Sequence, residues 1–287
     1  MKQLVFMACL CLSLGVWSAS AQQKEFSETI KKQVPLGNES ANSLVIRNVF
    51  GSVTVEGYNG STVVVEVEKI IRADNTSDLE LGKKELQLKV LQESDRVILH
   101  PDAPYMQFNA DKLSYNWCNN NEDVPYEHVL NFTVKVPNAV QVNVSTVNNG
   151  EVHVANTKGN YVEANNVNGG IRLTNITGKT KVNCVNGDVD ISYAQNPKVS
   201  SRYYALNGDI NISYQASLSA NISFKSMNGE MFTDFDIDKQ FVKTSKNGGD
   251  KGKPKYKFES RPVVQIGSGQ VDFDFETLNG NVFIKKI

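Results

Sequence analysis

The stretch Val185-Asn186-Gly187-Asp188-Val189-Asp190-Ile191 decides the fold of this chain, because its pattern recurs through the second half of the sequence. In each copy an apolar residue precedes Asn-Gly, and apolar and polar residues alternate one position later. The Asn-Gly pairs of the five regular copies are Asn168-Gly169, Asn186-Gly187, Asn207-Gly208, Asn228-Gly229 and Asn279-Gly280. A variant with one extra residue precedes them at residues 147–154. Self-similarity of this kind is typical of repeat architectures.

The spacing of the copies leaves two arrangements open. Successive asparagines of the regular copies are 18, 21, 21 and 51 residues apart. Asn-Gly suits turns with positive φ, and the residues after it alternate with the period of a strand. The copies are therefore either successive β-hairpins of a sheet or barrel, or coils of a β-solenoid. The same residue type at the same phase favours the solenoid, in which Val189, Ile191, Ile210 and Ile212 point into one core.

The rest of the chain is strand-rich but less regular. Residues 40–136 alternate over several segments, and within them residues 101–127 are expected to be a long loop insertion, with three prolines and Trp117. The Asn-Gly repeats occupy residues 139–287, with a hairpin insertion at 239–262. Since no clear linker separates the halves, we expect one domain over residues 22–287, in which the N-terminal strands cap the solenoid.

Residues 1–21 are typical of a secretory signal peptide. Lys2 precedes an apolar run at residues 4–16, which is too short to anchor a protein across a bilayer. Ala19 and Ala21 then fit the A-x-A pattern of a cleavage site. No later stretch is long and apolar enough to cross a membrane. We therefore expect an exported protein in the periplasm, on the outer-membrane surface or outside the cell.

Basic and acidic residues are nearly equal in number in the whole chain, but they are unevenly distributed along the sequence. The chain has 30 Lys+Arg and 31 Asp+Glu, a net charge of -1, which gives no support to nucleic-acid binding. Residues 239–262 hold eight basic and two acidic residues, a net +6. This segment is either a solvated hairpin or a contact for anionic glycan or lipid surfaces. The contact residues would be Lys243, Lys246, Lys251, Lys253, Lys255 and Lys257.

Columns formed by stacked coils are the candidate chemical sites. The residues after Asn-Gly are mostly acidic: Glu151, Gly170, Asp188, Asp209, Glu230 and Asn281. Asp188 and Asp209 on neighbouring coils would have carboxylates near the ~5–5.5 Å of a retaining glycosidase pair, or would share a Ca²⁺. The simpler interpretation is that short acidic residues suit exposed turns. The three histidines, His100, His128 and His153, lack metal-ligand spacing. We expect no catalytic residues, no metal and no other cofactor.

Two further features are read as structural. The column of repeat asparagines predicts an amide ladder, in which side chains hydrogen-bond from coil to coil. Cys118 and Cys184 remain after signal removal, in a compartment where a disulfide can form. The alternative is that Cys184 is a buried free thiol, since it occupies an inward-facing strand position.

The signal peptide, the strand-rich lead-in and the spaced N-G-[DEG]-[VI]-x-[VIL] repeats resemble the bacterial putative-adhesin proteins. These are β-strand-repeat proteins that are otherwise classed as a domain of unknown function. The resemblance covers roughly residues 40–287 and is most specific from Val147 onward. It implies a right-handed, single-stranded β-solenoid (β-helix-like) with a single sheet, export to the envelope or surface, and no established catalysis.

The sequence thus predicts an all-β, exported, non-enzymatic β-solenoid that acts as an adhesin, a surface-contact protein or a scaffold of the bacterial envelope. Its partner would be an envelope or host-surface glycan, a protein or an anionic lipid. One alternative is a carbohydrate-active β-helix enzyme, which requires a groove of clustered carboxylates, basic residues and aromatics. Another is an accessory protein of envelope-stress signalling, which the sequence does not separate from an adhesin.

Overall fold

A computed structural model describes residues 23–36, 42–117, 124–247 and 255–287. Its strands form two long sheets of 10 and 11 strands and a small sheet of two, and the described residues include one short helix. The expected all-β, solenoid-like repeat fold is confirmed. The signal peptide predicted at residues 1–21 lies outside the described residues, and the handedness of the coil stays a prediction.

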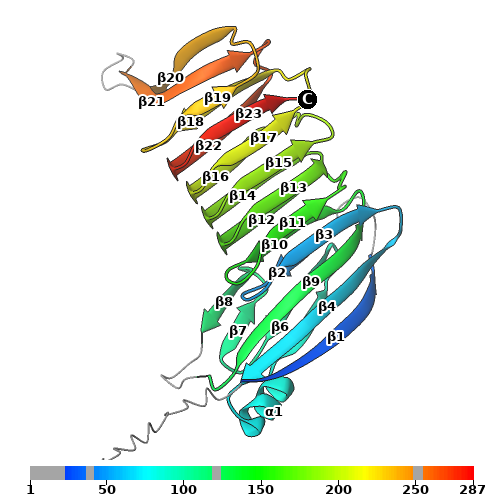
Figure 1. Cartoon of the computed structure of the whole chain (residues 1–287). Helices are drawn as coiled ribbons and strands as arrows, with labels where there is room; N and C mark the ends of the chain where they lie inside the picture. Colours follow the sequence, from blue (N-terminus) through cyan, green and yellow to red (C-terminus); the bar gives the residue numbers. More distant parts are fainter. Residues whose placement is uncertain (1–22, 37–41, 118–123, 248–254) are drawn as a thin grey trace, which may run out of the picture.

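The two long sheets run side by side along the molecule (Figure 1). In spatial order the 11-stranded sheet contains β20 (Lys239–Asn247), β21 (Lys255–Ile266), β18 (Ala220–Lys225), β22 (Val271–Asn279), β16 (Ser201–Asn207), β14 (Lys179–Asn186), β12 (Tyr161–Asn168), β10 (Gln141–Thr146), β2 (Ser43–Arg47), β6 (Arg96–Asp102) and β5 (Gln87–Gln92). The 10-stranded sheet contains β1 (Lys24–Pro35), β4 (Thr62–Ala73), β9 (Glu127–Pro137), β3 (Val53–Tyr58), β11 (Val152–Ala155), β13 (Ile171–Ile176), β15 (Val189–Tyr193), β17 (Ile210–Tyr214), β23 (Val282–Lys286) and β19 (Met231–Thr233).

Each coil of the solenoid supplies one strand to each long sheet, so the single-sheeted arrangement implied by the resemblance is wrong. The physical reason is that every coil turns twice. β12 ends at Asn168, the Asn-Gly turn follows, and β13 starts in the other sheet. A second turn at Gly178, whose φ is +84°, returns the chain to β14 in the first sheet. Neighbouring coils pair in parallel, as Val189 does with Ile210, which excludes successive hairpins.

The coils do not stack in the order of the sequence. The last coil, β22 and β23, lies between the coil of β16 and β17 and the coil of β18 and β19. Side-chain packing explains this order, because Phe275 of β22 stacks on Tyr203 of β16 with ring centroids 4.6 Å apart. Outside the core, Glu276 of β22 pairs at 3.1 Å with both Arg202 of β16 and Lys225 of β18. The last coil is therefore held in place by aromatic stacking in the interior and by ion pairs on the outer surface.

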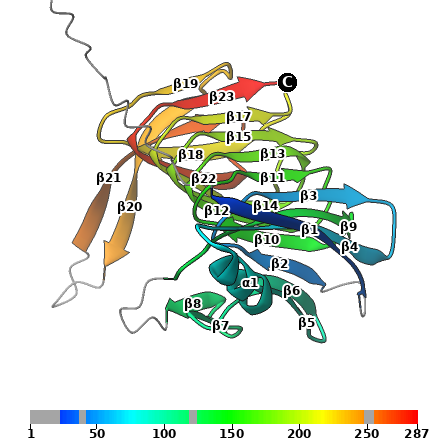
Figure 2. The same ribbon diagram turned by 60° about the horizontal axis from the view of Figure 1, so that its bottom comes forward.

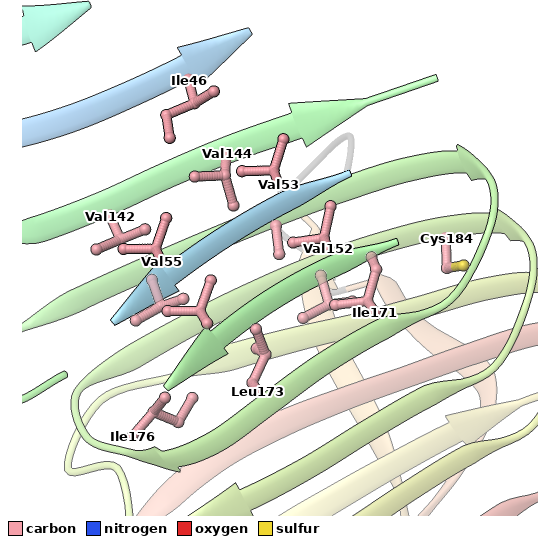
Figure 3. Packing of buried hydrophobic residues seen from close by; sticks show 14 of the residues in the cluster. Ile46, Val53, Val55, Val142, Val144, Val152, Ile171, Leu173, Ile176 and Cys184 are labelled. Atoms are coloured by element: carbon pink, nitrogen blue, oxygen red, sulfur yellow. The ribbon is translucent and has the colours of Figure 1, made fainter. Parts of the chain in front are cut away.

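The interior is a continuous layer of side chains from both sheets. Val189, Ile191, Ile210 and Ile212 are all buried in one cluster, as predicted. Figure 3 shows the same kind of packing in earlier coils, where Val53 and Val144 face one interior from opposite sheets. Burying such a side chain fully contributes about 1.5–3 kcal/mol relative to leaving it in water.

Cys184 lies in this interior as a free thiol. Its Sγ donates to the carbonyl oxygens of Gly169 and Gly187, at 3.3 and 3.2 Å. Burial raises the pKa of the thiol to about 11. The interpretation as a buried thiol is confirmed, and Cys118 lies outside the described residues.

The strands before the repeats form what we call the N-terminal assembly, which consists of β1, β4 to β9 and helix α1 (Thr76–Glu85). β1 and β9 flank β4 in antiparallel pairs and extend the 10-stranded sheet, while β5 and β6 extend the other. The segment expected as a loop at residues 101–127 contains the hairpin of β7 (Met106–Asn109) and β8 (Ser114–Trp117). Figure 2 shows α1 and this hairpin at the same end of the solenoid.

Candidate functional site

The repeat turns form an amide ladder, as predicted. Each Asn Nδ2 donates to the Asn Oδ1 of the adjacent coil at 2.6–2.9 Å, and the order from one end to the other is Asn228, Asn279, Asn207, Asn186, Asn168 and Asn148. The glycines after them allow close contact between coils. A Cβ on Gly208 would lie 2.2 Å from the carbonyl oxygen of Gly187, and φ at Gly208 is +147°. The ladder asparagines and the glycines after them therefore hold the stack together.

The acidic column after Asn-Gly is also structural. Asp188 Oδ1 accepts from the backbone N–H of Asp209 at 2.9 Å, and Asp209 Oδ1 accepts from that of Asn281 at 2.7 Å. Asn281 Oδ1 repeats the contact with the N–H of Glu230. These side chains satisfy the backbone of the neighbouring coil. Among the described residues no group of three or more His, Cys, Asp or Glu is arranged to hold a metal ion.

The basic segment at 239–262 is a hairpin in its backbone, since β20 and β21 pair in antiparallel fashion and β21 extends the sheet beyond β18. It lies at the far end of the stack from α1 (Figure 1). Lys251 and Lys253 lie outside the described residues, as do the side chains of Lys243, Lys246, Lys255 and Lys257. Their contact with anionic surfaces stays a prediction. Arg261 is described, and it pairs with Asp274 and Glu276 of the neighbouring β22.

A pocket in the N-terminal assembly has the geometry of a binding site. Its volume is about 340 Å³, and it lies where the ends of β8 and β4 meet the start of β9. Four aromatic side chains line it: Phe50, Tyr105, Trp117 and Tyr126. Its polar wall consists of Arg72, Glu127, His128 and Asn149. Concave, mostly apolar sites with a few placed polar groups are the usual form of ligand sites. We call this site the aromatic pocket.

Tyr105 is the centre of the aromatic cluster. Its ring lies 6.2 Å from that of Trp117 at an interplanar angle of 15°, and 6.1 Å from that of Tyr126. Tyr126 donates its hydroxyl to Glu85 Oε2 of α1 at 2.9 Å, which fixes the helix against the pocket. Trp117 is 57% exposed, whereas Tyr126 is buried. The aromatic cluster is thus buried at Tyr126 and exposed to solvent at the indole of Trp117.

His128 lies in the wall of the pocket without a full set of partners. Its Nδ1 lies 2.8 Å from the Tyr105 hydroxyl, and its Nε2 is buried with no hydrogen-bond partner among the described residues. Burial lowers the pKa of His128 to about 4, so the ring is neutral at neutral pH. An unsatisfied buried polar group costs about 1–3 kcal/mol, which makes this nitrogen a candidate contact for a ligand.

The charged side chains around the rim are more acidic than basic. Arg72 on β4 and Glu127 on β9 are cross-strand partners, and both line the pocket. Arg72 also donates from Nε to Glu25 Oε2 of β1 at 2.7 Å, which orients the guanidinium. Burial raises the pKa of Tyr105 to about 12, so this phenol is neutral as well. With Glu25 and Glu127 beside a single basic residue, the site disfavours an anionic ligand.

Comparison with known proteins gives the family. A model of the family described as Toastrack DUF4097 matches residues 33–260 of the chain. The chain belongs to this family. The family predicted from the Asn-Gly repeats is thereby confirmed, while a domain of unknown function assigns no activity to the pocket. No curated protein matches the chain.

Solved structures resemble this Toastrack DUF4097 chain only distantly. A putative cell adhesion protein from Clostridium sporogenes aligns with a TM-score of 0.44 and 12% identity, over 92% of this chain and 100% of its own. A putative lipid binding protein from Parabacteroides distasonis aligns at 0.39 and 12%, over 90% and 96%. A putative adhesin from Bacteroides fragilis aligns at 0.34 and 9%, over 91% and 97%. The family assignment rests on the family model.

Sequence reasoning missed the aromatic pocket of this Toastrack DUF4097 chain. Tyr105, Trp117 and Tyr126 fall in residues 101–127, where turn residues hid their clustering. His128 was detectable, because the inward alternation of Leu130, Phe132 and Val134 in β9 continues back to it. Phe50 and Asn149 reach the pocket only through folding, from turns about 100 residues apart in the sequence.

Proposed function

We propose that this Toastrack DUF4097 protein is an exported, non-enzymatic contact protein of the bacterial envelope, and that it binds its partner in the aromatic pocket. The single observation that carries this function is the pocket itself, where a half-exposed tryptophan, three further aromatics and a buried imidazole converge, and the Nε2 of that imidazole has no partner among the described residues. The polar groups at the repeat turns are engaged between coils, so the repeats act as a rigid support for the pocket. A rigid support keeps a binding site pre-organised, which lowers the entropic cost of binding.

Export and the absence of catalysis are parts of the proposal. Export is supported by the cleavage pattern at residues 1–21, and no helix in the described part of the chain is long and apolar enough to span a membrane. A binding role is supported by the partners of the two buried histidines. His100 Nδ1 contacts the backbone carbonyl of Pro101 and His128 Nδ1 contacts a tyrosine. A hydrolytic site of the Ser-His-Asp type instead requires a nucleophile, a histidine base and an orienting acid in contact.

The mature protein offers a direct test of binding. The sequence contains two tryptophans, and Trp17 lies within residues 1–21, so Trp117 is the sole tryptophan after signal removal. Its emission therefore reports on the pocket alone. We expect a saturable change in emission with at least one class among neutral sugars, acidic sugars, quaternary ammonium ions, fatty acids and short peptides.

The control separates the pocket from nonspecific binding. Calorimetry with the responding ligand should show binding by the wild type and by Phe232→Ala, which removes an exposed aromatic at the opposite end of the stack. Trp117→Ala should lose it. Secretion is checked by mass spectrometry, which should find a mature chain starting at Gln22. A ligand that binds Trp117→Ala as tightly as the wild type would contradict the assignment of the pocket.

A further inference from the structure

We infer that the aromatic pocket binds a single neutral pyranose ring, such as the terminal sugar of an envelope or host-surface glycan. This inference rests on the proposed function and adds the chemical class of the ligand. It is carried by three independent properties of the described residues: the size of the pocket, the combination of flat aromatic faces with planar polar side chains, and the lack of a net positive charge on the wall.

The size of the pocket selects a small ligand. Small-molecule sites range over about 300–1,000 Å³, and this one, at about 340 Å³, is near the lower limit. One sugar ring fits such a volume, whereas a folded peptide segment requires more. A longer glycan would place its terminal ring inside and its remaining units outside, beyond the exposed Trp117.

The aromatic side chains fit one face of a pyranose. A sugar ring carries axial C–H groups that form an apolar face, and this face packs against flat aromatic surfaces. Trp117 presents 57% of its surface to solvent, and its ring is nearly parallel to that of Tyr105. Tryptophan is enriched at contact surfaces, because its ring is apolar while its N–H can donate a hydrogen bond.

The polar wall fits the hydroxyl groups on the rim of the same ring. Arg72, Glu127 and Asn149 are planar donors and acceptors in the lining of the pocket. Bonds from charged side chains to neutral hydroxyls are stronger than those between neutral groups. Because Arg72 is already paired with Glu25 and Glu127 adds a second carboxylate, the rim gives no net attraction to an anion. A ligand with several hydroxyls and no charge uses both residues.

His128 adds a reason for a hydroxyl in particular. Among the described residues its Nε2 has no hydrogen-bond partner in either tautomer, because Nδ1 and the Tyr105 hydroxyl can share their proton either way. A hydroxyl both donates and accepts, so it satisfies Nε2 in either tautomer, directly or through one water. An acyl chain or an aromatic ligand would leave this nitrogen unsatisfied.

The test uses the mature chain and the emission of Trp117 at neutral pH. The probes are the methyl glycosides of glucose, galactose and mannose, with N-acetylglucosamine. Cyclohexanol serves as an apolar ring of similar size, glucuronate as an anion and choline as a cation. We expect a saturable response to at least one neutral sugar, with a Kd on the order of millimolar for a single ring, and none to the three comparison compounds.

A matched pair of variants places the sugar in the pocket. Asn149 and Asn175 both have positive φ, 59° and 54°, and both are exposed, so glycine fits either backbone. Asn149→Gly removes an amide of the pocket wall and should weaken sugar binding about three- to tenfold, the value of one neutral hydrogen bond. Asn175→Gly, near the end of β13 and not in the lining of the pocket, should bind as the wild type does.

The outcomes separate this inference from the function on which it rests. A response only to glucuronate, choline, cyclohexanol or a fatty acid overturns the sugar class and leaves the pocket as a binding site. No response to any compound overturns both. Equal sugar affinity in Asn149→Gly and Asn175→Gly would place the sugar elsewhere on the chain and overturn the inference.

Discussion

The strands of the repeats and those of the N-terminal assembly are held together by different kinds of side-chain contact. In the repeats, equivalent positions of every coil make equivalent contacts: asparagine bonds to asparagine along the ladder, and valine or isoleucine packs on its counterpart. In the N-terminal assembly each contact occurs once, as with Tyr105 and His128 or Tyr126 and Glu85. The regular contacts therefore make the repeats stiff. The non-repeating contacts of the N-terminal assembly instead bring side chains of different kinds together, and this allows a pocket to form.

The largest effect is expected from a charge in the interior of the repeats. Ile210 is fully buried between Val189 and Val282, so Ile210→Asp should lower the free energy of unfolding by about 4 kcal/mol or more, because an unpaired carboxylate would be buried. Urea denaturation of the mature chain measures this. Asn211→Ser, on the outer face of the same strand, should change it by less than about 0.5 kcal/mol. Equal losses in both variants would refute the single interior.

A smaller effect is expected from pH, and it belongs to the N-terminal assembly. Burial lowers the pKa of His128 to about 4, below the ordinary value of about 6.5, so the unfolded chain binds a proton first as pH falls. The stability is complete above pH 6.5 and is lost between 6.5 and 4, by about 3 kcal/mol from this residue. Burial also lowers the pKa of His100, which adds a loss in the same direction.

Unfolding free energies at pH 7, 5.5 and 4.5 test this assignment. His128→Gln should flatten the pH dependence, while His153→Gln, on the outer side of β11, should keep the wild-type slope. A wild-type slope in His128→Gln would show that the imidazole is not held neutral by the pocket wall.

The smallest effect is expected at the acidic column, where it tests whether Asp and Asn can replace each other at equivalent positions of the coils. Asp209 Oδ1 accepts from the backbone of the next coil, and Asn281 makes the same contact one coil further on. Asp209→Ala should therefore cost about 1 kcal/mol, the value of one hydrogen bond, whereas Asp209→Asn should cost less than half of that. Thermal unfolding of the two variants provides the comparison. If Asp209→Asn destabilises the protein as much as Asp209→Ala does, the stabilisation comes from the charge of Asp209 and not from its hydrogen bond.

The sequence by itself determined the parts of this protein that depend on near neighbours in the chain. Alternation after each Asn-Gly identified the inward residues Val189 and Ile210, and the recurrence of asparagine at one phase identified the ladder. Both signals are local, because a strand shows its two faces with a period of two and a turn requires particular residues at fixed positions. The family followed from the same repeats.

The tertiary structure alone decided which coil lies beside which and where the pocket forms. The coil of Asn279 lies between those of Asn207 and Asn228, because Phe275 and Glu276 match the strands on both sides. The pocket likewise joins Phe50, Trp117 and Asn149 from separate turns. Such contacts depend on complementary shape and charge between segments distant in the chain. No local pattern encodes them, because the sequence around one partner of such a contact does not indicate which distant segment supplies the other partner.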